Sequence, residues 1–309
     1  MNHLRRNLTT EKRALLLIAL ILCAGTAAGQ TLFPHPFVVE HQIVQTDPDG
    51  GFVTDPVTDY YAGSRIISVR PDDSRLVIDF SQRQLTEIRP DLRSFAVLSF
   101  DRFAELQDRL RDLEQGGFEA PREDEKIAAK AASDEEEPVF DFAELSAAGG
   151  PVKAAGADLT RRPGVRRLRV ALRQKSGAPG PAVEVWLDPA VPLAPAALDA
   201  LERFENQVLG ARDMEEVAFS RYIAAARKHA EGAFPIRTVR PLSAEGGVSE
   251  AGTVEDVALR LEPVATVPRE LLTVPEDYRR VPHPLEQMVA FAEEEAALRE
   301  RMSGSPRNP

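Results

Sequence analysis

The sequence predicts an α+β protein in which amphipathic helices lie against a mostly antiparallel β-sheet. Two patterns predict this fold class. Short runs of alternating apolar and polar residues recur about every ten residues, separated by Pro, Gly and Asp, as in antiparallel strands joined by tight turns. Other segments repeat their apolar residues every three or four positions, which is typical of helices with one buried face.

Residues 1–29 are predicted to be a cleavable secretory signal peptide. Four basic residues come before an apolar run, Ala14–Leu22, and small residues follow it. A signal peptidase substrate has this order, and cleavage is expected after Ala28 or Gly29. The run is about half of the ~20 apolar residues that a spanning helix needs, so no transmembrane segment is expected in the mature chain. The expected location is the periplasm or the medium.

Cysteine content and charge narrow the classes of function. Cys23 is the only cysteine and lies in the predicted signal peptide, where Leu22 replaces the small residue that precedes a lipidated cysteine. We therefore expect a mature chain without disulfides, thiolate metal sites or a lipid anchor. The full chain carries a net charge of −11, and residues 1–29 hold four basic and one acidic residue, which leaves the mature chain near −14. Such a charge argues against nucleic acid or an anionic membrane as a partner.

Residues 30–116 are predicted to form the N-terminal half of the sheet, followed by a helix. A turn signal lies at residues 47–51, and shorter ones lie near positions 71, 81 and 90. The strand-like runs are 36–44, Arg65–Val69, Arg75–Phe80, Gln84–Ile88 and Phe95–Phe100. The helix is predicted by Phe103, Leu106, Leu110 and Leu113, with Ser99 as its N-cap and Gly116 after its end.

The composition of residues 117–163 differs from that of the segments on either side. Acidic clusters come first, and a stretch rich in Ala, Gly and Pro follows them. We expect a mobile connector there, with at most a short helical piece. Residues 164–282 are predicted to form the C-terminal half of the sheet with its helices. Its predicted elements are strands from Val165 and at 183–188, helices from Pro195 and over Met214–His229, and strands near 234–239 and 254–261. Residues 283–309 are predicted to form an amphipathic helix, Leu285 to about Met302, and a tail.

Three short motifs in this order resemble an exported bacterial family of unknown function, itself similar to LolA-like periplasmic lipoprotein carriers. They are Val185–Asp188, Gly232–Thr238 and Pro268–Tyr278, where Asp277 replaces a usual Gly and Leu272 a usual Phe. The resemblance covers about residues 36–281 and does not extend to the acidic insert or the C-terminal helix. It implies a curved, unclosed β-half-barrel covered by helices, and it brings no catalytic residue with it.

Patterns for catalysis or metal binding are weak in this sequence. His35 and His41 lie roughly 20 Å apart if their segment is extended, so they cannot share a metal ion. His283 stands between two prolines at a helix start, which suggests a structural role. The segment Gly247–Gly252 does not have the spacing of a nucleophile elbow. We therefore expect no catalytic residue, no cofactor and no metal.

The alternating segment from Val165 carries a basic outer face. Arg167, Arg169 and Arg173 form a tentative interaction surface, either paired with acidic residues of the same chain or docked to an acidic partner. The leading expectation is a non-enzymatic, carrier-like periplasmic protein that binds a lipid, an acyl chain or a hydrophobic segment. The alternative is an envelope module that binds another protein, and a hydrolase is the third possibility.

Overall fold

The computed structural model describes residues 31–46, 51–115, 139–146, 158–173, 179–206, 214–244 and 247–303. The chain divides into two compact units, Met1–Thr31 and Leu32–Pro309, and every element below belongs to the second. The predicted signal peptide, the turn residues 47–50 and Gly116 lie outside the described residues. No helix in the described ranges is long and apolar enough to cross a membrane.

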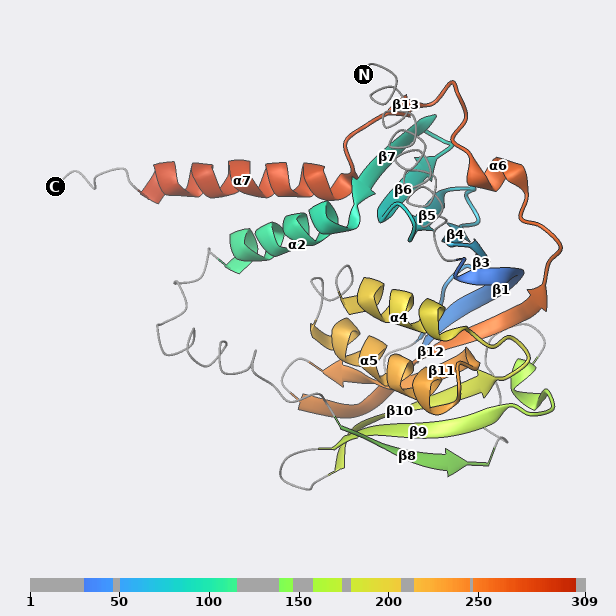
Figure 1. Ribbon diagram of the computed structural model, residues 1–309. Helices are drawn as coiled ribbons and strands as arrows, with labels where there is room; N and C mark the ends of the chain where they lie inside the picture. Colours follow the sequence, from blue (N-terminus) through green and yellow to red (C-terminus); the bar gives the residue numbers. More distant parts are fainter. Residues whose placement is uncertain are drawn as a thin grey trace, which may run out of the picture. The chain divides into compact units, whose positions relative to one another are not determined.

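The second unit is α+β, with thirteen strands in one large, mostly antiparallel, unclosed sheet (Figure 1). The strands span Phe33–Thr46 (β1), Phe52–Val53 (β2), Val57–Gly63 (β3), Arg65–Val69 (β4), Arg75–Asp79 (β5), Gln84–Arg89 (β6), Ser94–Ser99 (β7), Phe140–Leu145 (β8), Arg166–Arg173 (β9), Pro179–Asp188 (β10), Phe234–Ala244 (β11), Gly247–Pro263 (β12) and Arg279–Arg280 (β13). Their order is β13-β7-β6-β5-β4-β3-β1-β12-β11-β10-β9-β8, with β2 beside β1. Strand β1 therefore joins the N-terminal meander to the C-terminal strands.

The N-terminal meander confirms the predicted strands and turns. Strand β4 has the predicted bounds, and β5, β6 and β7 begin within one residue of theirs. Asp73, Arg83 and Arg93 adopt positive φ at the three corners between β4 and β7. This left-handed conformation closes short hairpin loops, and Asp is one of the few side chains that tolerate it well.

Helices α4 (Pro195–Phe204) and α5 (Met214–His229) cover one face of the sheet (Figure 1). The sequence predicts both, and α5 has the predicted bounds. Leu201 and Phe204 of α4 pack against residues from the meander and from β1. Tyr222, Ile223 and Ala226 of α5 pack against β9 and β10. The two helices thus cover parts of the sheet on both sides of β1.

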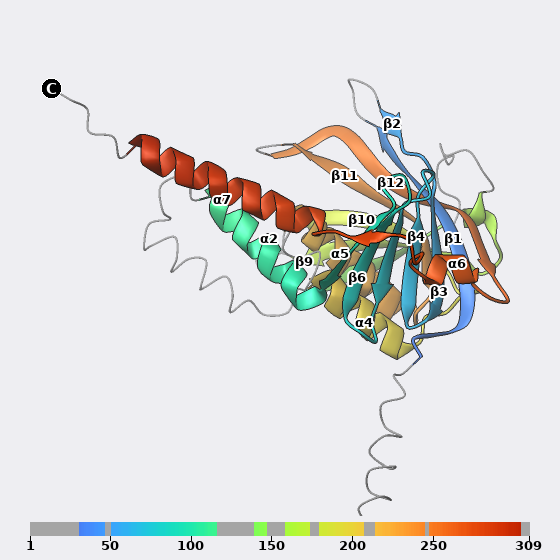
Figure 2. The ribbon, with the colours of Figure 1, turned by 90° about the horizontal axis from the view of Figure 1, so that it is seen from above.

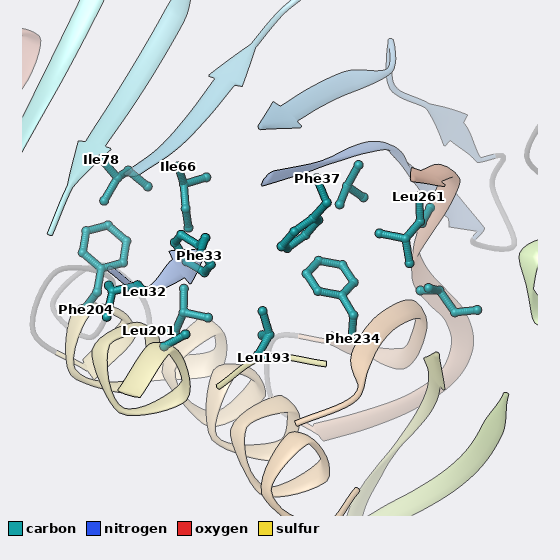
Figure 3. Packing of buried hydrophobic residues seen from close by; sticks show 14 of the residues in the cluster. Leu32, Phe33, Phe37, Ile66, Ile78, Leu193, Leu201, Phe204, Phe234 and Leu261 are labelled. Atoms are coloured by element: carbon teal, nitrogen blue, oxygen red, sulfur yellow. The ribbon is translucent and has the colours of Figure 1, made fainter. Parts of the chain in front are cut away.

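Aromatic rings fill much of the layer between the sheet and α4 (Figure 3). Phe37 stacks on Tyr61 with ring centroids 4.5 Å apart, and both meet the edge of Phe234. Phe204 lies 5.0 Å from Phe100 in the same cluster. Edge-to-face and stacked rings add about 0.5–1.5 kcal/mol per pair beyond the area that they bury. This core is built by side chains from segments more than 150 residues apart in the sequence.

A long strap, residues 264–281, covers the opposite face of the meander. Successive strand residues point to opposite faces, so Ile66 faces α4 while Ile67 faces the strap. Leu271, in the short helix α6 (Arg269–Leu272), and Tyr278 pack against Ile67. The strap ends in β13, which pairs in parallel with β7.

Helices α2 (Phe100–Gln115) and α7 (Pro284–Ser303) lie side by side and extend beyond the sheet (Figure 2). Ser99 Oγ accepts a hydrogen bond from the backbone N–H of Arg102 at 3.2 Å, which confirms the predicted N-cap of α2. Phe103 meets His283, and further along Arg109 pairs with Glu293. The contacts advance in the same direction along both helices, so the pair is parallel. We call this helix pair the α2–α7 arm.

The predicted connector contains one strand that the sequence analysis did not expect and one short helical turn of the kind that it allowed for. Strand β8 pairs with β9 and forms one edge of the sheet, and a 3₁₀ turn, Leu159–Arg161, precedes β9. The sequence analysis missed strand β8, whereas the 3₁₀ turn is a short helical piece within the predicted connector. Residues 116–138 and 147–157 lie outside the described residues.

Candidate functional site

The predicted basic surface lies on the face of β9 that points away from α5. Arg167 pairs with Glu184 at 2.6 Å, and Arg173 pairs with Asp141 of β8. Arg169 is exposed, and no residue that the structure describes forms an ion pair with it. Two of the three predicted interaction residues thus neutralise acids of their own sheet, as one of the two sequence interpretations held.

On the same face of the sheet as Arg167, the single tryptophan lies between two arginines. Trp186 is opposite Arg167 on one neighbouring strand and Arg237 on the other, with guanidinium carbons 4.8 and 4.6 Å from the ring centre. Arg237 is itself buried and pairs with buried Glu255 at 2.9 Å. Cations placed over an indole face are stabilised by its quadrupole, more so when water is excluded. Because Trp186 is only 1% exposed, this stack stabilises the sheet and offers no docking surface.

A strongly perturbed histidine lies on the helix-covered face, where three neighbouring strands meet. His41 of β1 places Nε2 3.3 Å from Asp59 Oδ2 on β3 and Nδ1 3.1 Å from Asp256 Oδ1 on β12. The His41 side chain is 25% exposed, so solvent screens it only in part. The two carboxylates thus bracket one imidazole across the centre of the sheet.

This bracket fixes the protonation state of His41. Burial disfavours the charged ring, but the hydrogen bonds to Asp256 and Asp59 outweigh burial and raise the pKa of His41 from 6.5 to about 10. At neutral pH, His41 is therefore a cation with a proton on each nitrogen. It has no lone pair to accept a proton or to bind a metal, so it is neither a general base nor a metal ligand in this state.

Charged groups of the helices extend this cluster. Arg227 of α5 pairs with Glu205, directly after α4, at 3.1 Å. Burial raises the pKa of Tyr61, and the nearby Asp59 adds to the effect. Asp59 Oδ1 and Arg227 Nε are buried without a hydrogen-bond partner among the described residues. Buried polar atoms of this kind are commonly satisfied by an ordered water.

The other histidines have structural partners or lie at the surface. The Nδ1 atom of His283 accepts a hydrogen bond from the N–H of Leu285, and Glu286 accepts one from the N–H of His283. This reciprocal cap begins α7 and agrees with the structural role inferred from the flanking prolines. His229 stacks on Phe142, and His35 is exposed. The described residues contain no group of three His, Cys, Asp or Glu side chains placed to hold a metal ion.

The largest exposed apolar side chains of a helix lie along the outer face of α7. Leu285 and Val289 on its inner face are buried against Leu98 and Leu106. Three further apolar side chains, spaced by three and seven residues, are more than half exposed. They are Met288, Phe291 and Leu298, with Phe291 68% exposed, and we call them the outer stripe.

The sequence analysis identified α7 as amphipathic but missed its second apolar face. The signal is present in the spacing, because at 100° per residue Phe291 and Leu298 fall opposite Val289, while Met288 lies on the flank of the helix. Nothing in the sequence marks the His41 cluster, because its three residues come together only through the pairing of β1 with β3 and β12.

Comparisons with known proteins give no family for this chain. No protein-family model matches it, and no curated protein is found as a relative. It is similar to an uncharacterized conserved protein from Thermus thermophilus, with 9% identity and a TM-score of 0.35 over 81% of this chain and 91% of that chain. It is also similar to PNGF-II in its C2 and P21 crystal forms, with 9% and 10% identity and TM-scores of 0.32 and 0.33 over 84% of this chain.

This chain covers 33% and 34% of the two PNGF-II chains, about a third of their length. With TM-scores below 0.5, none of these likenesses carries an argument about fold or function.

Proposed function

We propose that this is an exported, non-enzymatic binding protein that holds a hydrophobic protein segment on the outer stripe of α7. The observation that carries the proposal is that three large apolar side chains of α7 are exposed, while the described chain buries the apolar side chains on the inner face of the helix. Leu285 and Val289 are buried against α2 and β7, while Phe291 on the other side is 68% exposed. Large exposed apolar side chains grouped on one surface mark interaction sites in soluble proteins, so a partner is expected to cover the outer stripe.

The arm presents this stripe on a helix that is already formed. The His283–Glu286 cap holds the start of α7, and the Arg109–Glu293 pair ties its middle to α2. A preorganised surface loses little conformational entropy on binding, so the contacts of the stripe contribute more fully to affinity. Binding a hydrophobic segment in this way is the helix-packing mode of recognition, in which apolar side chains on one side of a helix anchor the partner.

The test replaces the stripe without touching the core. A variant with Met288→Ser, Phe291→Ser and Leu298→Ser should keep its melting temperature, because these side chains are exposed. It should lose a partner that the wild-type protein retains in a quantitative pulldown from the native envelope. A matched control, Leu92→Ser at an exposed apolar residue in the turn between β6 and β7, should retain that partner. If the triple variant and the control retain the same proteins, the stripe is not the binding surface.

A second candidate is a lipid carrier, and the apolar layer between the sheet and α4 favours it. In this proposal the sheet is a half-barrel, α4 and α5 are its cover, and an acyl chain lies between them. Phe204 and Phe234 fill part of that layer now, so α4 would have to move outward to admit the chain. Native mass spectrometry should then find co-purified lipid, and a disulfide between α4 and the sheet should abolish it. A purified protein without lipid, unchanged by that disulfide, would contradict the carrier role.

A further inference from the structure

We propose that the free edge of β8 pairs with β8 of a second copy of this chain, in an antiparallel register centred on Phe142. Strand β8 is at one end of the sheet, and among the described residues only β9 pairs with it (Figure 1). A row of unpaired backbone N–H and C=O groups is a template for another strand. This edge is separate from the outer stripe of α7, so the inference goes beyond the proposed function.

The hydrogen bonds to β9 show which backbone groups of β8 point to the free edge. The Arg173 N–H donates to the Val139 carbonyl at 2.8 Å, and the pairing of β8 with β9 has no register shift. Hydrogen-bonded and non-hydrogen-bonded pairs alternate along an antiparallel ladder, so the odd-numbered residues of this strand bond to β9. The even-numbered residues, Phe140, Phe142 and Glu144, therefore point their N–H and C=O groups to the free edge.

The edge is regular, and its charges are neutralised within one copy. Strand β8 contains no proline, no glycine and no bulge, which are features that disturb pairing at other sheet edges. Glu144 pairs with Arg166 of β9 at 3.0 Å, and Asp141 pairs with Arg173. Although the whole chain is acidic, two copies that meet at this edge bring no unpaired carboxylate of β8 together.

An antiparallel pair centred on Phe142 uses the backbone groups that point to the free edge. This register places Phe142 opposite its own counterpart, and Phe140 opposite Glu144 of the second copy in both directions. Each of these pairs exchanges both of its backbone hydrogen bonds. The two Phe142 rings lie on the same face of the joined sheet, where a cross-strand aromatic pair is stabilising. The interface is isologous, because the same strand serves both copies.

The remaining side chains of the strand also fit this register. Asp141 is opposite Ala143 of the second copy, so like charges do not face each other directly. Val139, which is 51% exposed, is opposite Leu145 and gains an apolar neighbour. An axis at Asp141 would set two aspartates directly opposite each other, which is destabilising, and an axis at Ala143 would place Val139 beyond the end of the opposing strand. An extended segment of another protein gains the same match only if its sequence repeats this pattern.

The first test removes one backbone donor at the free edge. Glu144→Pro deletes an N–H that points away from β9, a position at which an edge strand tolerates proline. Glu144→Ala is the matched control, because it loses the same ion pair with Arg166 and keeps the N–H. Sedimentation equilibrium of the mature full-length protein measures the dimer at concentrations up to about 0.5 mM, in high salt that screens the acidic net charge.

The wild type and Glu144→Ala should form a dimer whose population rises with concentration. Glu144→Pro should weaken this dimer at least about tenfold, because each copy loses a hydrogen bond and the proline ring meets the opposing strand. A wild type that stays monomeric over the whole range would overturn the proposal. Equal association of the proline and alanine variants would overturn it as well.

Two substitutions at Ala143 test the register and do not depend on the proline variant. The side chain of Ala143 is exposed, and the proposed register sets it opposite Asp141 of the second copy. Ala143→Asp should weaken the dimer about two- to tenfold, and Ala143→Lys should tighten it by a similar factor. Within one copy the effects on melting temperature should run the other way, because Ala143 is opposite Arg169 of β9. A dimer that changes in the same direction for both variants would overturn the register.

Two further measurements separate this interface from other interactions. The triple serine variant of the outer stripe should dimerise like the wild type, and a loss of its dimer would place the interface on α7 instead. The competing occupant of the β8 edge is an extended segment of another protein. A monomeric wild type, together with an envelope protein that is retained by Glu144→Ala and lost by Glu144→Pro, would assign the edge to that partner and overturn the second copy.

Discussion

His41 shows how one residue can join two halves of a sheet. The N-terminal meander reaches the sheet centre through β3, the C-terminal strands reach it through β12, and β1 lies between them. Asp59 and Asp256 belong to those two flanking strands, and both contact His41. Hydrogen bonds to a charged group contribute about 1.5–3 kcal/mol each, so the bracket is a strong local tie across this junction.

The bracket predicts a stability that depends on pH in a defined window. The pKa of His41 rises from 6.5 to about 10 on folding, so its contribution is fully present below pH 6.5 and is lost as the pH rises through 10. The contribution is on the order of 5 kcal/mol. Denaturant unfolding of the wild type and of His41→Gln should therefore show a large difference in unfolding free energy at pH 6. That difference should shrink steadily towards pH 10.

His35→Gln is the matched control, because His35 is on the same strand but exposed. Its unfolding free energy should follow the wild type at every pH. A difference between wild type and His41→Gln that stays constant from pH 6 to pH 10 would show that the two carboxylates do not hold the proton on His41.

The residues of this cluster could not be found from the sequence. Asp59 is 18 residues from His41, and Asp256 is 215 residues from it. Neither separation matches the repeat of a single helix or strand, so no local pattern connects the three residues. The sequence does show that His35 and His41 cannot chelate together. The structure adds why His41 matters, because a shift in register by one residue would turn its side chain to the other face of the sheet.

At the scale of elements, the sequence predicted helices and strands correctly where their local patterns were strong. Helix α5 and strand β4 have their predicted bounds. Strand β8 was missed because its acidic and Ala-rich surroundings favour disorder. It forms because β9 offers an edge and because Phe140 and Phe142 pack against Tyr222 and His229 of α5. Tertiary contacts outweigh weak local preference at this edge.

The turn that follows α5 predicts a difference between two glycines. Gly232 has a φ of 87°, and a Cβ there would lie 2.3 Å from the carbonyl oxygen of Leu193. Gly63 has a φ of 62°, but a Cβ there meets nothing within 4 Å. Gly63→Ala should cost about 1 kcal/mol for the left-handed backbone alone. Gly232→Ala should cost at least about 2 kcal/mol more, because the backbone around Leu193 must move.

Thermal and denaturant unfolding of the two variants measure this difference. The Leu193 N–H donates to the Gly232 carbonyl at 2.8 Å, so the strain should also weaken the connection between β10 and α4. Equal losses for the two variants would mean that the close approach at Leu193 relaxes without cost.

The two faces of α7 predict opposite outcomes for similar truncations. Val289→Ala removes two methyl groups buried against Leu98 and Leu106 and should destabilise the protein by about 1–3 kcal/mol. Leu298→Ala on the outer stripe should change stability by less than about 0.5 kcal/mol. Unfolding of both variants by urea measures this, and partner binding should show the reverse order. A large loss of stability for Leu298→Ala would mean that the outer stripe is covered in the isolated protein.

At the scale of the whole molecule, the fold class followed from the sequence but the strand order did not. Alternation and turns predict a meander, and β3 to β7 are indeed consecutive neighbours. No local pattern shows that β1 pairs with β12, because this pairing joins residues more than 200 positions apart. The strap was also beyond prediction, since its partly buried Leu271 and Tyr278 pack only on a face made by other strands. Long-range register is the part of the fold that periodicity cannot supply.

The predicted export of the whole chain leads to a last test that is independent of any partner. If residues 1–29 are a signal peptide, protein recovered from outside the cytoplasm should begin at Gly29 or Gln30 and contain no cysteine, because Cys23 leaves with the peptide. Intact-mass spectrometry should find this unmodified chain, with no acyl group and no reaction with a thiol reagent. Leu22→Gly restores a small residue before Cys23 and serves as a contrast, since it should favour acylation. A wild-type mass that includes a lipid, or retention of residues 1–29, would contradict the proposed release into the periplasm or medium.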